Sequence, residues 1–73
     1  MSWLEELDEQ IRKKWKINET FRIEEVYLME GYFSRRHPRN DHVRDKLRQL
    51  LQCLRDDDVL EFVDNVGTYK RLK

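Results

Sequence analysis

The chain has 73 residues, of which 41% are charged and 38% hydrophobic, and its formal net charge is zero. A chain this short forms one small domain over residues 1–73 with little spare volume for a catalytic pocket, and no paired-carboxylate, Ser/His/Asp or Cys/His pattern is visible, so we do not expect an enzyme. The single cysteine, Cys53, excludes an internal disulfide and a Cys-based zinc finger, and we expect neither a metal nor a cofactor.

The first predicted element is an amphipathic helix over residues 1–17. Ser2 and Glu5 have the spacing of a capping box at its start. Hydrophobic residues then recur at the helical period: Trp3, Leu4, Leu7, Ile11 and Trp15. Acidic residues gather in the first turns and basic residues in the last, which suits the helix dipole. We expect both tryptophans to make core or interdomain contacts rather than to stack on bases.

A helix-turn-helix is predicted over residues 21–56. Phe21 and Arg22 form a very short strand, and a second helix follows from about Ile23. The apolar face of this helix comprises Ile23, Val26, Tyr27, Met29 and Phe33. Its far end is weakened by Gly31.

A polar turn at residues 34–40 separates this helix from the next. Pro38 ends the preceding helix, and Asn40 or Asp41 caps a long helix over residues 41–57. Two helices joined by a short polar turn are typical of a helix-turn-helix.

The long helix has two different faces. Its hydrophobic stripe consists of Val43, Leu47, Leu50, Leu51 and Leu54. The opposite side is polar, with Asp45, Gln49, Gln52 and Asp56 at its centre, Arg44, Arg48 and Arg55 on one flank, and Lys46 on the other. This side is either merely solvated or functional. Gln, His, Asp and Arg can hydrogen-bond base edges in a major groove, which favours the functional interpretation.

After the long helix, the pattern changes to a β-hairpin over residues 59–72. Strands are expected at Val59–Val63 and Thr68–Leu72, joined by a turn that ends at Gly67. The order of elements is that of a winged helix, a mainly α fold with a small β-hairpin. In this fold the third helix enters the major groove and the hairpin contacts the flanking backbone.

The charges are segregated although the net charge is zero. Residues 35–55 contain seven basic and two acidic residues, which gives +5, and Lys70, Arg71 and Lys73 add to the basic charge. Such a chain can present a basic face to phosphates. The candidates for contacts with the DNA backbone are Arg35, Arg36, Arg39, Asn40, Lys46, Lys70 and Arg71.

Several segments resemble a known family. The motifs F-R-I-E-E-V-Y, H-P-R-N-D-H-V-R-D-K-L-R-Q-L-L-Q-C-L-R-D and G-T-Y are similar to the winged-helix domain that ends DpnI-type restriction endonucleases, the Dam-replacing helix-turn-helix family. The resemblance runs from about Phe21 to the C-terminus and is most specific at residues 38–56. The chain departs from the family pattern at Leu51 and Asp58, where Gln and Gly are expected.

This resemblance implies a reader of double-stranded DNA that carries N6-methyladenine in G-A-T-C. It also implies a separate N-terminal nuclease domain in a parent protein, so that the chain is either an excised C-terminal domain or a stand-alone relative. We expect an intracellular protein, cytoplasmic if prokaryotic, with no membrane span, that acts as a monomer.

A methylated adenine poses a chemical problem for the long helix. Asn or Gln normally reads adenine through N6 and N7, but a methyl group on N6 blocks this bidentate pair. Apolar contact must replace it, and one buried methyl contributes about 0.8 kcal/mol. The candidates for base reading are His42, Arg44, Asp45, Arg48, Gln49 and Gln52.

Each candidate has a predicted chemical role. The His42 ring and the stems of Gln49, Gln52 and Arg48 are expected to line an apolar niche for the methyl groups. Arg44 or Arg48 is expected to pair with guanine, and Asp45 to accept from cytosine N4. Two alternatives stay open: a DNA-binding regulator that ignores methylation, and a winged-helix domain that binds proteins.

Overall fold

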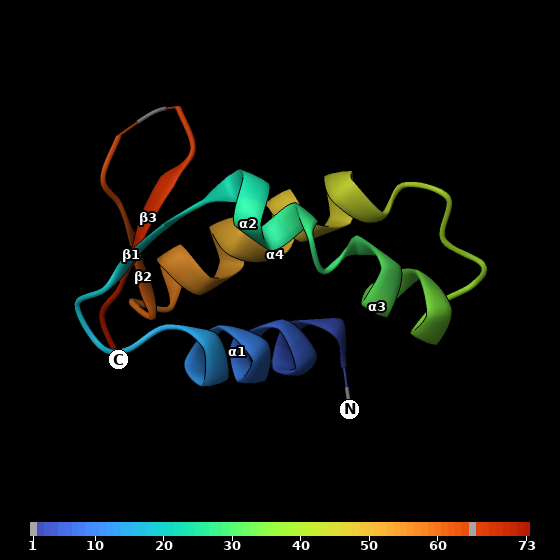
Figure 1. The fold of residues 1–73 in the computed structure, drawn as a ribbon, viewed down its shortest axis with the longest axis horizontal. Helices are drawn as coiled ribbons and strands as arrows, with labels where there is room; N and C mark the ends of the chain where they lie inside the picture. Colours follow the sequence, from blue (N-terminus) through green and yellow to red (C-terminus); the bar gives the residue numbers. More distant parts are fainter. Residues whose placement is uncertain (1, 65) are drawn as a thin grey trace.

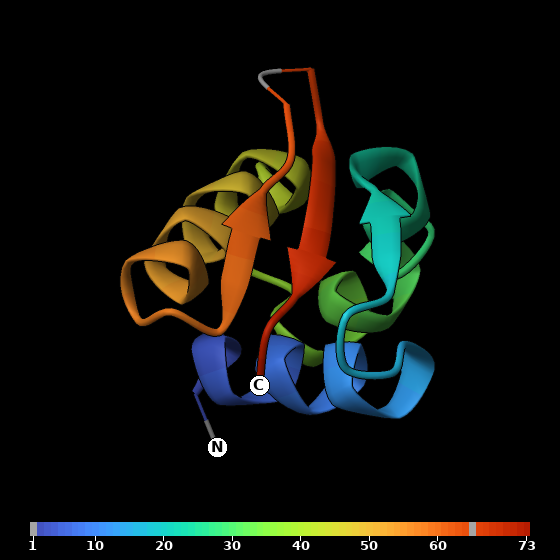
Figure 2. The same ribbon diagram turned by 90° about the vertical axis from the view of Figure 1, so that its left-hand side faces the viewer.

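The computed structural model describes residues 2–64 and 66–73. The described helices are α1 (Trp3–Lys14), α2 (Ile23–Tyr27), α3 (Glu30–Arg36) and α4 (Val43–Asp56), and the strands are β1 (Thr20–Arg22), β2 (Leu60–Phe62) and β3 (Thr68–Arg71). In Figure 1, α1 runs along one side of the molecule, and the strands lie at one end of the helices. Figure 2 shows the loop between β2 and β3 projecting away from α1. The predicted fold class, mainly α with a small β-hairpin, is confirmed.

The three strands form one antiparallel sheet in the order β1-β3-β2. Tyr69 pairs with Phe21 on one side and with Phe62 on the other. The predicted hairpin is therefore extended by the short strand that precedes α2. The regular strands are slightly shorter than predicted, although the bond from Val63 N–H to the Thr68 carbonyl, at 2.9 Å, continues the ladder by one step.

The predicted capping box of α1 is confirmed. The Ser2 hydroxyl accepts from Glu5 N–H, and Ser2 N–H donates to the Glu5 carboxylate, each at 3.2 Å. The predicted end at residue 17 is wrong, because the chain leaves the helix at Trp15, whose backbone is extended (φ −127°, ψ 143°). Asn18 then turns the chain towards β1 with φ 72°.

The predicted second helix divides into α2 and α3. Met29 N–H donates to the Val26 carbonyl at 2.9 Å, an i to i+3 bond that tightens the chain between the two helices. Leu28 at this point is 78% exposed, whereas Val26 and Phe33 on either side are fully buried. The spacing of hydrophobic residues did not reveal the break, because the apolar face predicted for a single helix continues through Met29 to Phe33.

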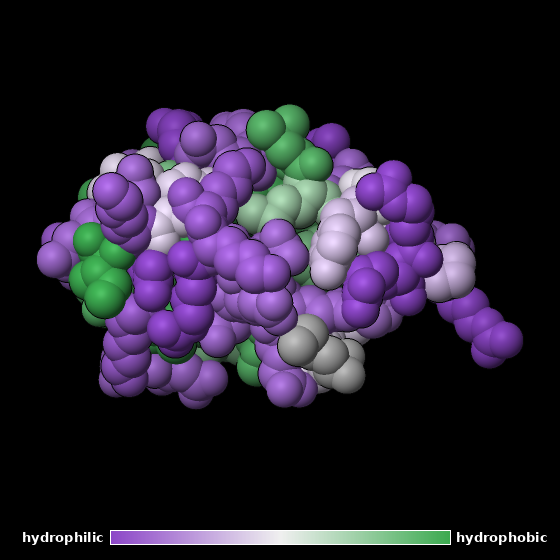
Figure 3. All heavy atoms as spheres, turned by 60° about the horizontal axis from the view of Figure 1, so that its bottom comes forward, coloured by the Kyte–Doolittle hydropathy of each residue, from purple (hydrophilic) through white to green (hydrophobic). Residues whose placement is uncertain are grey.

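The hydrophobic stripe of α4 forms the centre of the core. All five predicted stripe residues are buried: Val43, Leu47, Leu50, Leu51 and Leu54. Leu51 has no exposed surface, which accounts for a hydrophobic residue where the family pattern suggests Gln. The stripe packs against α1, α2, α3 and β2. The outer surface of α1 in Figure 3 is mainly hydrophilic, with only small areas of hydrophobic colour.

Aromatic stacking fixes α1 at both of its ends. Trp15 stacks on Phe21 with ring centroids 4.0 Å apart, and Phe21 in turn lies 5.6 Å from Tyr69. At the other end, Trp3 stacks on Phe33 at 5.6 Å. Both tryptophans thus make core contacts, as expected from the sequence.

The end of α4 depends on a left-handed residue at Asp58, whose φ is 60°. Asp58 N–H donates to the Arg55 carbonyl at 3.0 Å, and Val59 N–H donates to the Leu54 carbonyl at 2.9 Å. This pair of bonds is a Schellman motif, in which glycine is the usual left-handed residue. Asp58 therefore adopts the backbone conformation that suits the glycine expected from the family pattern.

Replacing Asp58 with glycine is expected to stabilise the domain. Glycine has no Cβ and adopts positive φ freely, so D58G should raise the free energy of unfolding by about 0.5–1 kcal/mol. Urea denaturation measures the change. D57G is the matched control, because Asp57 has φ −87° and gains nothing from glycine. Equal stability of D58G and the unaltered chain would show that the left-handed Asp58 is not strained.

Candidate nucleic-acid interface

The long helix begins two residues later than predicted. α4 starts at Val43, and His42 is the N-cap residue. The Asn40 side-chain oxygen accepts from His42 N–H at 2.8 Å. Asn40 therefore stabilises the turn before the helix and does not cap the helix. The prediction that Asn40 or Asp41 caps the helix is therefore wrong. His42 lies in the turn before the helix, and Arg44 lies in the first helical turn.

The outer face of α4 is lined by exposed polar side chains. These are Arg44, Asp45, Arg48, Gln49 and Gln52, five of the six candidates for base reading. They lie opposite the buried stripe because of the helical period. The sixth candidate, His42, is also exposed. Lys46 is half-buried on the other flank of the helix.

A cleft of about 480 Å³ lies between the outer side of α4, the helix α2 and the β2–β3 hairpin. Three aromatic rings and three polar side chains of α4 take part in its walls. Its lining comprises Ile23, Tyr27, Arg48, Gln52, Arg55, Phe62, Asp64, Val66, Gly67 and Tyr69. Arg55 lies over the Phe62 ring at 4.5 Å from its centroid. The cleft thus brings Arg48 and Gln52 together beside aromatic surface, whereas the other base-reading candidates lie outside its lining.

The hairpin is anchored to α2 through Gly67. Ile23 N–H donates to the Gly67 carbonyl at 2.9 Å. Gly67 has φ 98°, and a Cβ there would lie 2.9 Å from Ile23 Cγ2, so the turn requires glycine for both conformation and space. The Asp64 carboxylate accepts from Val66 N–H and Thr68 N–H, and these bonds lower the pKa of Asp64.

The hairpin offers few positive charges to a DNA backbone. Residues 63–68 contain no lysine or arginine, and the exposed Asp64 brings a negative charge to the loop. Lys70 of β3 is half-buried. The hairpin loop therefore adds no positive charge to that of residues 35–48.

Arg44 has two partners that sequence analysis did not identify. Its Nε donates to Glu30 Oε1 at 3.0 Å. Its guanidinium lies over the Tyr27 ring, 4.9 Å from the centroid. Tyr27 had been assigned to the apolar face of the second helix, and no pattern in the sequence linked either Tyr27 or Glu30 to Arg44.

The candidates for DNA-backbone contacts differ in their surroundings. Arg35 and Arg39 are exposed, and in the described part of the chain neither forms an ion pair. Arg36 is also exposed, but its Nε donates to Glu6 Oε1 at 2.7 Å. Asn40 is half-buried within its turn.

Glu6 is the centre of a polar cluster that links α1 to the end of α3. Only 3% of Glu6 is exposed, and its second carboxylate oxygen accepts from His37 Nε2 at 2.8 Å. The His37 ring stacks on Trp3 at 4.0 Å. Hydrogen bonds from His37 and Arg36 lower the pKa of Glu6. Sequence analysis had placed Glu6 only in the acidic first turn of α1.

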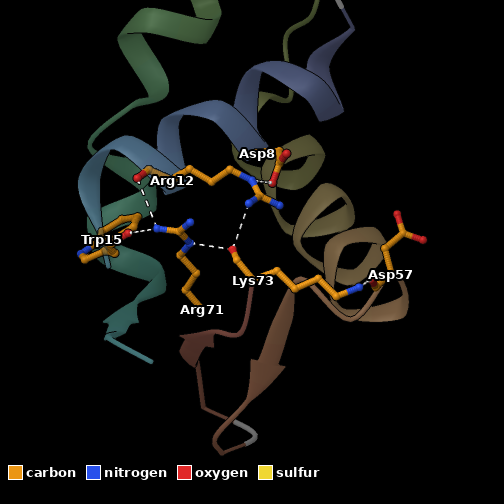
Figure 4. Close-up of polar contacts among 6 residues, drawn as sticks. All are labelled: Asp8, Arg12, Trp15, Asp57, Arg71 and Lys73. Carbon is orange, nitrogen blue, oxygen red and sulfur yellow. Dashed lines mark hydrogen bonds and ion pairs between the residues drawn. The ribbon is translucent and has the colours of Figure 1, made fainter. Parts of the chain in front are cut away.

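The Arg71 side chain is engaged at the end of α1 (Figure 4). Its Nη1 donates to the Trp15 carbonyl at 2.7 Å and to the Arg12 carbonyl at 3.4 Å. Its Nε donates to the Lys73 backbone oxygen at 2.7 Å. Arg71 thus satisfies carbonyl groups at the C-terminal end of a helix, a position that favours a cation.

A helix-turn-helix whose last helix exposes one polar face, followed by a β-hairpin that packs beside that helix, defines a winged-helix domain. Comparison with known families agrees with this class. The family model described as the Dam-replacing HTH domain matches residues 2–71, and the chain belongs to this family. A helix-turn-helix family indicates DNA binding, which is not a catalytic function. Within residues 2–64 and 66–73, no helix is both long and apolar enough to cross a membrane.

Removing the charge of Glu6 is expected to destabilise the domain. E6Q leaves Arg36 and His37 without their carboxylate, so the free energy of unfolding at pH 7 should fall by about 1–3 kcal/mol. Because folding lowers the pKa of Glu6, its contribution is present above the ordinary pKa of 4.5 and is lost as the pH falls below that value. The difference between E6Q and the unaltered chain should therefore shrink in acid.

Chemical denaturation between pH 3 and pH 7 measures this difference. E9Q is the control, because Glu9 lies on the same helix and pairs with the exposed Lys13, an arrangement that contributes about 0–1 kcal/mol. If E6Q and E9Q lowered the stability equally, the buried cluster would have no special role.

Proposed function

We propose that this domain binds double-stranded DNA by placing α4 in the major groove, and that it reads N6-methyladenine in a G-A-T-C site. The observation that supports this proposal best is the outer face of α4, where Arg44, Asp45, Arg48, Gln49 and Gln52 are all exposed. These residue types match the donors and acceptors of base edges in the major groove. The family indicates DNA binding in general, and the methylated site is our extension of it.

The chemistry of the methyl group requires apolar surface beside these polar groups. Gln52 and Arg48 border a cleft whose walls include the rings of Tyr27, Phe62 and Tyr69. Their stems can contact a methyl group while their polar ends contact neighbouring base edges. Two methyl groups lie close together in a fully methylated G-A-T-C site, and burying both is worth about tenfold in affinity. We assign the exposed ring of His42 and the stem of Gln49 to the same contact.

Phosphate contacts hold the domain on the duplex in this proposal. Among the basic candidates for backbone contacts, Glu6 engages Arg36 and the end of α1 engages Arg71, which leaves Arg35, Arg39, Lys46 and Lys70. Arg36 retains one guanidinium edge beyond its bond to Glu6, and its side chain is 50% exposed. The turn that contains Asn40 can contact a phosphate. The domain acts as a monomer, and a parent protein with a separate nuclease domain would use it to find methylated sites.

Titration of three duplexes tests the methyl contact. Fully methylated G-A-T-C should bind about tenfold or more tightly than unmethylated G-A-T-C at one fixed salt concentration, with the hemimethylated duplex between them. Fluorescence anisotropy measures the three dissociation constants. Equal affinities would disprove methyl reading and leave a methylation-blind DNA-binding domain. No binding at low salt would instead favour the protein-interaction alternative.

Alanine variants separate base reading from phosphate contact. Q49A and H42A should reduce the ratio of methylated to unmethylated affinity severalfold, because each removes apolar contact with the methyl groups. R39A should weaken all three duplexes alike and reduce the slope of log K against log salt by about 0.9, because it removes one phosphate contact. Identical behaviour of H42A and R39A would show that this division between the two roles is wrong.

A further inference from the structure

Arg44 is the base-reading candidate whose guanidinium is held on two sides. Glu30 Oε1 accepts from its Nε at 3.0 Å, and the Tyr27 ring lies beneath its guanidinium at 4.9 Å. Both partners come from outside α4, since Tyr27 ends α2 and Glu30 begins α3. The first turn of α4, the helix proposed to enter the groove, therefore contains an arginine whose orientation is set by the two preceding helices.

The free edge of this arginine is the one that guanine requires. Within the described residues, the only hydrogen bond of the Arg44 side chain is made through Nε, which leaves Nη1 and Nη2 as a pair of donors. The side chain is 60% exposed, so this pair is accessible. Two parallel N–H donors match O6 and N7 of guanine in the major groove. By contrast, Arg48 borders the cleft without an ion pair in the described part of the chain.

We infer that Arg44 reads the guanine of the site and that Glu30 and Tyr27 are positioning residues for it, an inference that rests on the proposed function for the identity of the site. Fixing a long side chain before binding lowers the conformational entropy lost on binding. Stacking on an aromatic ring and a charge-assisted bond to Nε both favour one orientation of the guanidinium plane. Arg44 rather than Arg48 is thus assigned to guanine.

The charge of Glu30 makes the inference testable, because a purely electrostatic role and a positioning role predict different changes in DNA binding. A carboxylate near the start of a DNA-binding helix repels phosphates, so its removal should strengthen binding to every duplex if charge is its only effect. If Glu30 positions Arg44, its removal must instead reduce the preference for guanine. The two effects are separable because one changes the overall affinity and the other changes a ratio of affinities.

The experiment compares guanine with 7-deazaguanine, which lacks the N7 acceptor, in otherwise identical G-A-T-C duplexes. The measured quantity is the ratio of the two dissociation constants for each protein, obtained with methylated and with unmethylated duplexes. The unaltered domain should prefer guanine about fivefold or more. R44A should lower the ratio to about one. E30Q and Y27A should lower it to below about twofold, whereas Y27F should retain most of it.

E24Q is the matched control, because it removes one carboxylate of α2 that pairs with Arg22 of β1 and not with Arg44. It should raise the affinity for all duplexes slightly and leave the ratio unchanged. Circular dichroism and thermal denaturation establish that each variant is folded, and Y27F keeps the ring if Y27A is unfolded. An E30Q ratio equal to that of E24Q would overturn the role of Glu30, and an R44A ratio equal to that of the unaltered domain would overturn the assignment of guanine.

The outcomes also separate this inference from the proposed function. A guanine preference that E30Q abolishes, together with equal binding of methylated and unmethylated duplexes, would refute methyl reading and support the role of Arg44. A methyl preference without any preference for guanine N7 would do the reverse. Failure to bind any duplex would overturn both.

Discussion

Burial of one hydrophobic stripe on α4 is the interaction on which the rest of the domain depends. Leu47 and Leu51 are fully buried, and the stripe packs against three other helices and β2. A domain of this size has no second core that could hold a separate recognition element. Because the helical period fixes the opposite side, the packing of these leucines also determines where Asp45 and Gln49 project. Folding and the proposed recognition of DNA therefore use the two faces of the same fourteen-residue helix.

Pairing of charges explains how a chain with zero net charge can still form a DNA-binding domain. Glu6 engages Arg36, Glu30 engages Arg44, and Arg71 is engaged by backbone carbonyls of α1. Glu6 and Glu30 each bind one particular arginine side chain, so their effect is more than a reduction of the net charge. Arg35 and Arg39, just before α4, are exposed and form no ion pair within the described residues. The electrostatic character of the interface thus depends on which cations are engaged, a property that net charge does not describe.

Features that depend on local spacing were predicted from the sequence. The capping box at Ser2, the stripe of α4 and the order of elements followed from residue period and turn residues, and the structure agrees with them. Features that depend on distant partners were not predicted. Arg36 and Arg71 were assigned from charge alone, because their partners lie thirty residues or more away in the sequence.

The start of α4 shows the same limit at short range. Both Asn40 and Asp41 are good capping residues by type, but the Asn40 side chain closes a turn onto His42 N–H, which delays the helix to Val43. Residue type correctly indicated that a side-chain oxygen accepts from a backbone N–H. The donor, however, is His42 N–H in the turn and not an N–H of the first helical turn. The break at Leu28 was not predicted, because an apolar face at helical spacing runs from Ile23 to Phe33 and gives no sign of two helices.

The stack of Trp3 on His37 gives the domain a built-in optical probe. Trp3 is only partly buried and borders the turn that contains Arg39 and Asn40, whereas Trp15 is 7% exposed in the core. The two indoles therefore sense different parts of the molecule. Emission from Trp3 follows the placement of the imidazole stacked on it, while emission from Trp15 follows the integrity of the fold. With Trp15 replaced by phenylalanine, the fluorescence of Trp3 would report changes in the turn that contains Arg39 and Asn40, without an attached dye.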